Sequence, residues 1–199
     1  MLTMYDYLDS GNGYKCRLLL AQLGLPYERV ELDIDRGETR RPAFLAKNPN
    51  GRIPALGLED GTVLAESNAI LCYLADGSSY WPAERLLRAQ VLQWLFFEQY
   101  SHEPYVATPR YIIRHLGRQH ARMAELPARL AKGYEAFAVM EGHLAQQPFF
   151  VGGQYSIADI ALYAYTHRAD EADMDLSAYP AIRAWLARVA AQPGHIKML

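Results

Sequence analysis

The sequence predicts an α/β N-terminal domain followed by an all-α C-terminal domain. Strand and helix patterns alternate over residues 1–76, while no strand pattern appears after Pro82. A polar connection rich in chain-breaking residues, at 76–79, separates the two halves. We therefore expect domains at residues 1–76 and 85–199, joined by a linker over residues 77–84.

The N-terminal half predicts the element order β-α-β-α-β-β-α. We expect a buried strand at 2–8, a helix from Tyr14 until Gly24 stops it, and a half-buried strand at 27–34, where apolar and charged residues alternate. The remaining elements are a helix at 41–47, strands at 55–58 and 62–65 with a two-residue Asp60-Gly61 turn, and a helix at 67–75. This order resembles a thioredoxin-like domain.

The C-terminal half predicts helices alone. They are expected at 84–100, 126–146, 156–166 and 181–191, and Pro104 and Pro109 should bend or interrupt the continuation of the first. Ser156 and Asp159 have the spacing of a capping box, with the aspartate in the place usually taken by Glu or Gln, which indicates a structural role at a helix start.

Composition excludes several classes of protein. A formal net charge of -2 gives no reason to expect a nucleic acid or an anionic membrane as partner. No apolar run is long enough to span a bilayer and no secretory signal is apparent, so we expect a cytoplasmic protein. Cys16 and Cys72 lie in predicted helices and are expected to be buried thiols, not a disulfide. The six histidines lack metal-binding spacing, so no metal is expected.

Residues 48–67 contain the strongest candidate for a binding site. Pro54 cannot donate to a strand ladder, so the backbone of Ile53 is available to an extended peptide ligand, which a cis Ile53-Pro54 bond would expose. Ser67 is placed as a helix N-cap, where free N–H groups attract a carboxylate, and Glu66 beside it suits an ammonium group. The alternative is simply a capped helix after a hairpin.

Four sequence segments together resemble a cytosolic glutathione transferase, and the chain is identified as a bacterial member of that superfamily. The resemblance covers nearly the whole chain. It implies glutathione as co-substrate, no metal and a role in detoxification. The segments that carry it are 37–54, Glu66-Ser67, Ser10-Gly-Asn12-Gly-Tyr-Lys15 and Ser156-Ile-Ala-Asp159.

By this resemblance, Ser10 matches the catalytic serine and Asn12 a secondary or alternative donor to the glutathione thiol. Lowering a thiol pKa from about 8.5 by two units takes roughly 2.7 kcal/mol of thiolate stabilisation, which hydrogen-bond donors and a helix N-terminus supply. Taken alone, the composition of Ser-Gly-Asn-Gly favours an ordinary turn, and the motifs further along the chain reverse that preference. Lys15 is interpreted as a solvated or loop-anchoring cation.

Arg40 and Arg52 match positions that hold the glycyl carboxylate of glutathione in the family. Thr39 stands where the plant-type version of this segment usually has a histidine, so the contact of that histidine with the glycyl carboxylate is expected to be weaker or replaced. Solvated arginines remain the alternative. The resemblance also makes Tyr105 a candidate wall for the electrophilic substrate.

A series of arginines runs through the predicted helical half at four-residue spacing. Few acidic residues are near it in sequence, so it either attracts an anionic co-substrate or forms a solvated helix face. Its members are Arg110, Arg114, Arg118 and Arg122.

The leading functional hypothesis is a transferase that activates glutathione for attack on a small electrophile. Alternatives are a glutathione-dependent peroxidase or disulfide reductase and a non-catalytic binding protein. In a reductase, glutathione itself would carry the chemistry, because Ser10–Gly13 stands where redox proteins have Cys-x-x-Cys. By the resemblance, we expect a homodimer, because members of the family generally pair. Trp94, Phe96 and Phe97 are also more apolar residues than one core-facing side of a helix requires, which suggests an additional contact surface.

Overall fold

The computed structural model describes residues 1–198 and divides the chain into two compact units. The first unit contains residues 1–76 and the segment from Pro193 onward, and the second contains Gly77–Gln192. We expected the C-terminal segment in the helical domain. It joins the first unit instead, because the buried Tyr14 ring needs a partner for its hydroxyl, which donates to the Ile196 carbonyl at 2.7 Å.

A four-stranded mixed sheet forms the centre of the first unit. Its strands are β1 (Leu2–Asp6), β2 (Tyr27–Glu31), β3 (Ala55–Gly57) and β4 (Val63–Ala65), in the order β2-β1-β3-β4. β1 runs parallel to β2 and antiparallel to β3, which pairs antiparallel with β4. The second strand ends earlier than expected because the Asp33 carboxylate accepts hydrogen bonds from two following N–H groups and turns the chain.

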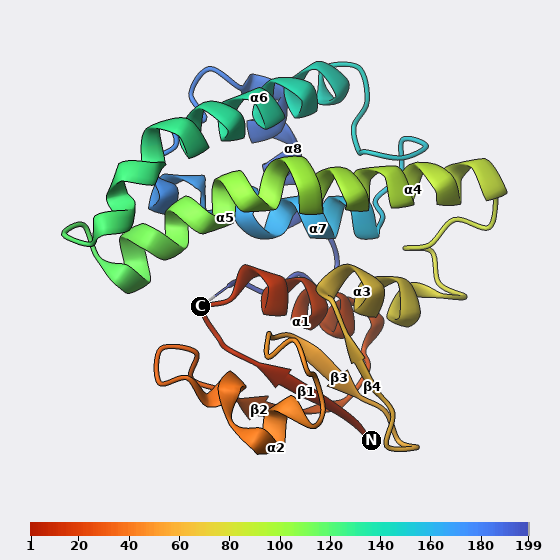
Figure 1. Cartoon of the computed structure of the whole chain (residues 1–199). Coiled ribbons are helices and arrows are strands. Elements are labelled where there is room, and N and C mark those ends of the chain that lie inside the picture. The colour runs from red at the N-terminus through yellow and green to blue at the C-terminus, as the bar shows by residue number, and fades with distance from the viewer. Residues whose placement is uncertain (199) are drawn as a thin grey trace. The chain divides into compact units, whose positions relative to one another are not determined.

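Helices cover both faces of this sheet (Figure 1). Successive side chains of β1 point to opposite faces, so Tyr5 packs on Phe44 at 6.0 Å between ring centroids, while Asp6 lies against Gly13 of α1. α3 packs beside α1, whereas α2 lies on the other face. The elements are α1 (Gly11–Leu23), η1 (Glu38–Arg40), α2 (Pro42–Leu45) and α3 (Ser67–Ala75).

The hairpin between β3 and β4 is present, but its loop is longer than expected. The Leu58 N–H donates to the Thr62 carbonyl at 2.8 Å, and the Gly61 N–H donates to the Leu58 carbonyl at 3.1 Å. Three residues therefore separate the paired positions, and Gly61 takes φ +87°, the left-handed conformation that glycine adopts without strain.

The second unit is built from helices. α7 is its buried centre, since every residue of this helix is buried, and it packs against α4, α5 and α8. The bounds are α4 (Arg85–Phe97), η2 (Glu98–His102), α5 (Glu103–Tyr111), η3 (Ile112–Leu116), η4 (Ala121–Glu125), α6 (Leu126–Leu144), α7 (Ile157–Thr166), η5 (Ala169–Ala172) and α8 (Pro180–Ala190). The α/β and all-α division expected from sequence is confirmed.

The helix break expected near Pro104 takes the form of a π-helical turn. η2 follows α4 directly, and α5 then starts with Pro104 in its first turn. Because proline has no N–H to donate to the preceding turn, the regular α-helical hydrogen bonding is interrupted there. Pro109 lies inside α5, which continues to Tyr111 before a second π-helical turn, η3.

The capping box expected at the start of α7 is confirmed, and its aspartate also binds groups outside this helix. Asp159 accepts from the Ser156 N–H at 2.9 Å, and it also accepts from the Trp185 indole at 2.9 Å and the Phe150 N–H at 3.2 Å. One carboxylate therefore ties α7 to α8 and to the loop before α7.

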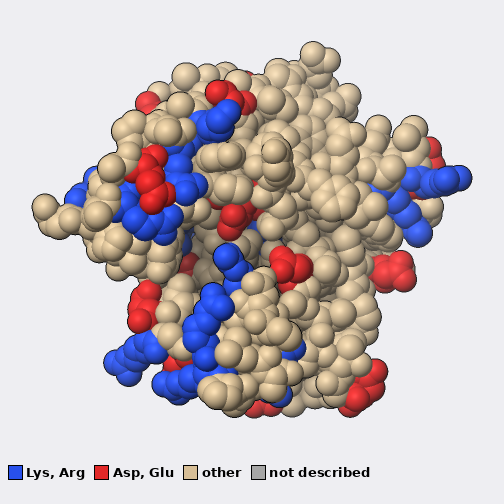
Figure 2. All heavy atoms as spheres, viewed as in Figure 1, with Lys and Arg blue, Asp and Glu red and all other residues tan. Residues whose placement is uncertain are grey.

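Three arginines of the series, Arg110, Arg114 and Arg118, pair with acids that are distant in sequence, whereas Arg122 pairs with the nearby Glu125. Arg110 is buried and contacts Glu171 at 2.5 Å, and Arg118 makes two bonds of 2.7 Å to Asp173. Figure 2 shows basic and acidic side chains interspersed over this end of the unit. A solvated face is therefore wrong for Arg110, and each arginine of the series contacts an acidic side chain.

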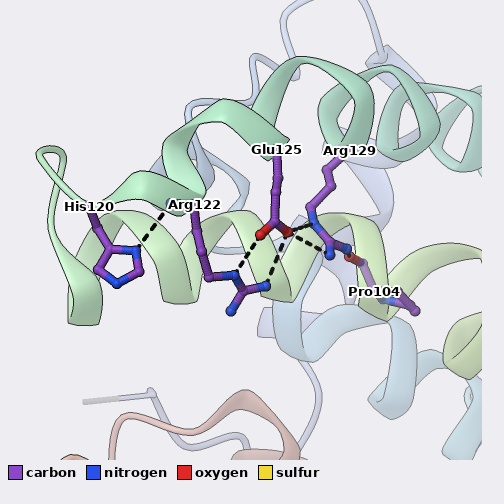
Figure 3. A network of polar contacts seen from close by, with 5 residues as sticks. All are labelled: Pro104, His120, Arg122, Glu125 and Arg129. Carbon is purple, nitrogen blue, oxygen red and sulfur yellow. Dashed lines mark hydrogen bonds and ion pairs between the residues drawn. The ribbon is translucent and has the colours of Figure 1, made fainter.

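Glu125 is the centre of one of these ion-pair clusters (Figure 3). It accepts from Arg122 at 2.7 Å and from Arg129 at 2.9 Å, and Arg129 also donates to the Pro104 carbonyl at 3.1 Å. These hydrogen bonds lower the pKa of Glu125 to about 2. The cluster ties the start of α6 to the start of α5.

Both cysteines are free thiols. Cys16 is fully buried, as expected, whereas Cys72 is only half-buried on α3. Burial raises the pKa of both thiols. Within residues 1–198, no helix has the length and apolarity to cross a membrane, and no three His, Cys, Asp or Glu side chains gather where they could hold a metal ion.

Candidate functional site

Ser10 caps the N-terminus of α1. Its backbone is extended, and its hydroxyl oxygen accepts from the Gly13 N–H at 3.2 Å. The helix starts at Gly11, so residues 11–13, expected as a loop, form its first turn. The Ser10 hydroxyl oxygen is used as an acceptor here, which leaves the O–H as the end that can donate.

Gly13 is required by the packing of this turn. A Cβ at this position would lie 1.6 Å from Asp6 Oδ1. Asp6 is fully buried and forms an ion pair with Arg17 at 2.8 Å, and burial raises its pKa to about 6 despite the guanidinium. The start of α1 therefore rests directly on a buried carboxyl group.

Lys15 lies inside the site. Its side chain is fully buried, and Nζ donates to Asn12 Oδ1 at 2.8 Å and approaches Ser67 Oγ at 3.5 Å. The expectation of a solvated cation is therefore wrong, and the anchoring alternative matches the contact with Asn12. A predicted helix start at Gly11 in place of Tyr14 would have indicated the contact between Asn12 and Lys15, because residues at i, i+3 spacing lie on the same face of a helix.

Ser67 is the first residue of α3, and the N-cap position belongs to Glu66. Ser67 as N-cap is therefore wrong, because Glu66 takes φ +68° and turns the chain one residue earlier. A non-glycine residue in this region costs on the order of 1–3 kcal/mol and is found mainly at functional sites. The buried Ser67 hydroxyl instead donates to Asn12 Oδ1 at 3.3 Å, while the Glu66 side chain is exposed.

The Ile53-Pro54 peptide bond is cis. The sheet register starts at Ala55, so the half-buried Ile53 lies outside the strand pairing. The preceding loop is fixed by Asn48, whose side-chain amide donates to the Arg52 carbonyl at 2.8 Å.

Arg40 and Arg52 are both exposed side chains on this part of the first unit. Arg40 donates to the Asn50 carbonyl at 3.0 Å, so it braces the loop from η1. Figure 2 shows basic side chains gathered over the segment around η1 and α2. A carboxylate here would meet a positive local field.

The two remaining candidate regions lie in the second unit. Tyr105 is half-buried in the first turn of α5. Trp94 is only 8% exposed and packs on Phe150 at 4.5 Å, so its assignment to an additional contact surface is wrong: the core uses it. Phe96 is 69% exposed, and Phe97 is half-buried.

The first unit thus brings together the N-terminal ends of α1 and α3. Asn12 and Ser67 meet across this junction, and Lys15 lies beneath both. Helix N-termini and a buried cation favour anions, so the junction can hold a carboxylate and a thiolate near each other.

Comparison with known proteins identifies the family. The family model "Glutathione S-transferase, N-terminal domain" matches residues 1–76, and the corresponding C-terminal model matches residues 123–188. A solved glutathione S-transferase from Pseudomonas fluorescens is 56% identical, with a TM-score of 0.97 over 100% of this chain and 98% of that one. The disulfide-bond oxidoreductase YfcG of Escherichia coli is 31% identical, over 97% of this chain and 92% of its own length. The chain belongs to the glutathione transferase family.

The transferase fold extends to more distant members of that family. The glutathione transferase URE2P8 of Phanerochaete chrysosporium, solved with oxidized glutathione, is 26% identical with a TM-score of 0.86, over 97% of this chain and 90% of that one. Relatives of this chain therefore include both transferases and an oxidoreductase, and the site residues must decide between these activities.

Proposed function

We propose that the protein is a glutathione transferase that ionises the thiol of glutathione for attack on a small electrophile. The observation that carries the proposal is the junction of Asn12, Lys15 and Ser67, which joins two helix N-termini around a buried cation. Such a junction suits a ligand that brings a carboxylate and an ionisable thiol a few bonds apart.

The tripeptide is assigned to the site by its charged ends. The γ-glutamyl carboxylate meets Ser67 and the end of α3, and Glu66 receives the ammonium group. Its cysteinyl backbone pairs with Ile53 before Pro54, as an added strand. The glycyl carboxylate is held by the exposed arginines of the first unit. These are Arg40 and Arg52.

Ser10 and Asn12 stabilise the thiolate. The Ser10 O–H and the N–H groups of the Asn12 amide donate to the sulfur, with the positive end of α1 behind them. The thiolate then forms a carbon–sulfur bond, and the leaving group departs with the bonding electron pair or an opened ring takes up a proton. Tyr105 is assigned to the wall of the electrophile site.

A disulfide or peroxide reductase is the second candidate, and the similarity to YfcG favours it. The chain has Ser10 and Gly13 in the positions of a redox Cys-x-x-Cys pair, so its own residues supply no dithiol there. Glutathione thiolate would attack a disulfide sulfur or a peroxide oxygen, and a second glutathione would release oxidised glutathione.

One screen tests these activities. Glutathione turnover is measured with aryl halides, isothiocyanates, hydroperoxides and mixed disulfides, with the Ser10→Ala/Asn12→Ala double variant as control. Conjugation lost in the double variant supports the transferase, and turnover confined to peroxides or disulfides supports the reductase. Glutathione binding without rate enhancement toward any substrate overturns both in favour of a ligand-binding protein.

A further inference from the structure

We propose that Lys15 is a positioning residue that orients the Asn12 amide toward the glutathione thiol and places a positive charge behind it. The inference rests on the proposed function, because it concerns how the same site lowers the pKa of the thiol. The geometry that points to it is the triangle of Lys15 Nζ, Asn12 Oδ1 and Ser67 Oγ, with sides of 2.8, 3.3 and 3.5 Å.

The lysine determines which way the amide of Asn12 faces. A lysine ammonium carries three donors and no acceptor, so the Asn12 atom beside it at 2.8 Å must be the oxygen. The Ser67 hydroxyl approaches the same oxygen at 3.3 Å. The amide nitrogen therefore takes the other arm of the amide group, and its N–H groups are directed away from the lysine.

The charge of Lys15 strengthens that amide as a donor. A cation that binds an amide oxygen withdraws electron density, so the amide N–H groups donate more strongly to an anion. Lys15 is fully buried, so the interaction is screened less than at a surface. A thiolate in front of Asn12 gains from both the donor and the field, whereas a neutral thiol gains from neither.

Lys15 also links the two anionic groups of the ligand. Ser67 has one hydroxyl proton, which reaches Asn12 Oδ1 in the structure. When that proton turns to the γ-glutamyl carboxylate, Lys15 still donates to Asn12 Oδ1. Recognition of the γ-glutamyl end and ionisation of the thiol are thereby compatible.

The variants Lys15→Met and Lys15→Arg test the proposal, with Lys132→Met as the matched control. Methionine keeps an unbranched side chain and removes the charge. Lys132→Met makes the same replacement at an exposed lysine on α6. The pKa of bound glutathione is measured by thiolate absorbance, together with kcat and KM against pH. In Lys15→Met we expect the thiol pKa to rise by about one unit, a tenfold change in ionisation.

The steady-state constants separate positioning from folding. In Lys15→Met, kcat at neutral pH should fall about tenfold and recover at alkaline pH, since the rate profile follows the thiol pKa. KM for glutathione should change less than about threefold. Lys15→Arg should recover part of the lost rate, and Lys132→Met should match the unmodified protein.

A second measurement needs no glutathione. The chain has four asparagines, so 15N-asparagine labelling gives a small set of side-chain amide signals. We expect the Asn12 signal to shift and exchange faster in Lys15→Met while the others stay in place. If Lys15→Met fails to fold, Lys15→Gln, which keeps a donor without the charge, is measured in the same way.

The outcomes separate this inference from the proposed function. An unshifted Asn12 signal, or an unchanged thiol pKa in the folded Lys15 variants, overturns the role of Lys15 while the transferase stands. If the unmodified protein does not lower the pKa of bound glutathione, the proposed function fails, and the amide signal still decides whether Lys15 positions Asn12.

Discussion

The Ser10 hydroxyl oxygen accepts a hydrogen bond from the Gly13 N–H at 3.2 Å, so the proposed catalytic serine is also the cap of α1. The two roles use different ends of the hydroxyl, because capping needs its oxygen and thiolate stabilisation needs its proton. Substitution of Ser10 should therefore change both the stability of the fold and the ionisation of the bound thiol.

We predict that Ser10→Ala raises the pKa of bound glutathione by a unit or more and lowers turnover near neutral pH. Loss of the cap should cost about 1 kcal/mol of stability as well. Ser10→Gly is the control for the cap, because glycine at an N-cap loses only a few tenths of a kcal/mol. Asn12→Ala should shift the thiol pKa less than Ser10→Ala. Thiolate absorbance against pH ranks the two, and a larger shift in Asn12→Ala would reverse the assignment.

Gly13→Ala should destabilise the first unit, although alanine is normally the better helix residue. Its Cβ would lie 1.6 Å from the carboxyl of Asp6, which is fully buried and cannot move to solvent. We expect a loss of about 1–3 kcal/mol or more, as for other overpacked sites.

Gly142→Ala is the matched control for Gly13→Ala. Gly142 lies in α6, and among residues 1–198 no neighbouring atom comes within 4 Å of the place that an alanine Cβ would take. Alanine should therefore stabilise the helix by roughly 0.5–1 kcal/mol. Thermal melting by circular dichroism compares the pair. Equal melting temperatures would show that Asp6 gives way to the new methyl group.

Ser67→Ala should weaken glutathione binding by about 1.5–3 kcal/mol, the range for a hydrogen bond to a charged group. Because Ser67 is not the cap of α3, its hydroxyl does not stabilise the helix end directly, so the melting temperature should change little. Titration calorimetry and thermal melting separate the two effects. Unchanged affinity would remove Ser67 from the γ-glutamyl site.

The sequence predicted the elements well where local patterns decide them. Alternation, glycine stops and the spacing of Ser156 and Asp159 are local signals, and they located most strands, the helices of the second unit and the capping box. The errors have tertiary causes. Glu66 takes a positive φ, which glutamate rarely adopts, and therefore becomes the N-cap of α3 in place of Ser67.

The sequence allowed candidate site residues to be named, but it did not predict the contacts between them. The motifs containing Ser10, Asn12 and Ser67 were recognisable, but the burial of Lys15 depends on α3 packing beside α1, which residue spacing does not encode. The pairing of Arg110 with Glu171 has the same cause, since the two residues are 61 positions apart. Long-range charge pairing is the information that a single sequence lacks.

We predict a homodimer in solution. With Trp94 in the core, the surface argument rests on α4, where Phe96 is 69% exposed and Leu92, one turn earlier, is 38% exposed. Light scattering at micromolar concentration should give twice the 22.5 kDa chain mass. Phe96→Ser should shift the protein toward the monomer, and exposed Val139→Ser on α6 is the control. A monomeric mass for the unmodified protein contradicts the prediction.

The carboxyl of Asp159 should make the stability of the second unit depend on pH. Burial raises its pKa from 3.8 to about 6, although it accepts hydrogen bonds from Trp185, Phe150 and Ser156. Between these two values the folded chain holds a proton that the unfolded chain has released. Stability from this group is therefore complete below the unfolded pKa of 3.8 and is lost as the pH rises through about 6, by up to roughly 3 kcal/mol.

Asp159→Asn removes this titration and also turns an amide N–H group toward a donor, so the variant should be destabilised by about 1–3 kcal/mol. Because only the unmodified protein loses the contribution of Asp159 as the pH rises, the difference between them should be larger near pH 4 than near pH 7. The three tryptophans, at 81, 94 and 185, all lie in the second unit, so urea unfolding followed by their fluorescence reports this unit. A difference that instead grows with pH would mean that the donors around Asp159 outweigh its burial and hold its pKa below 3.8.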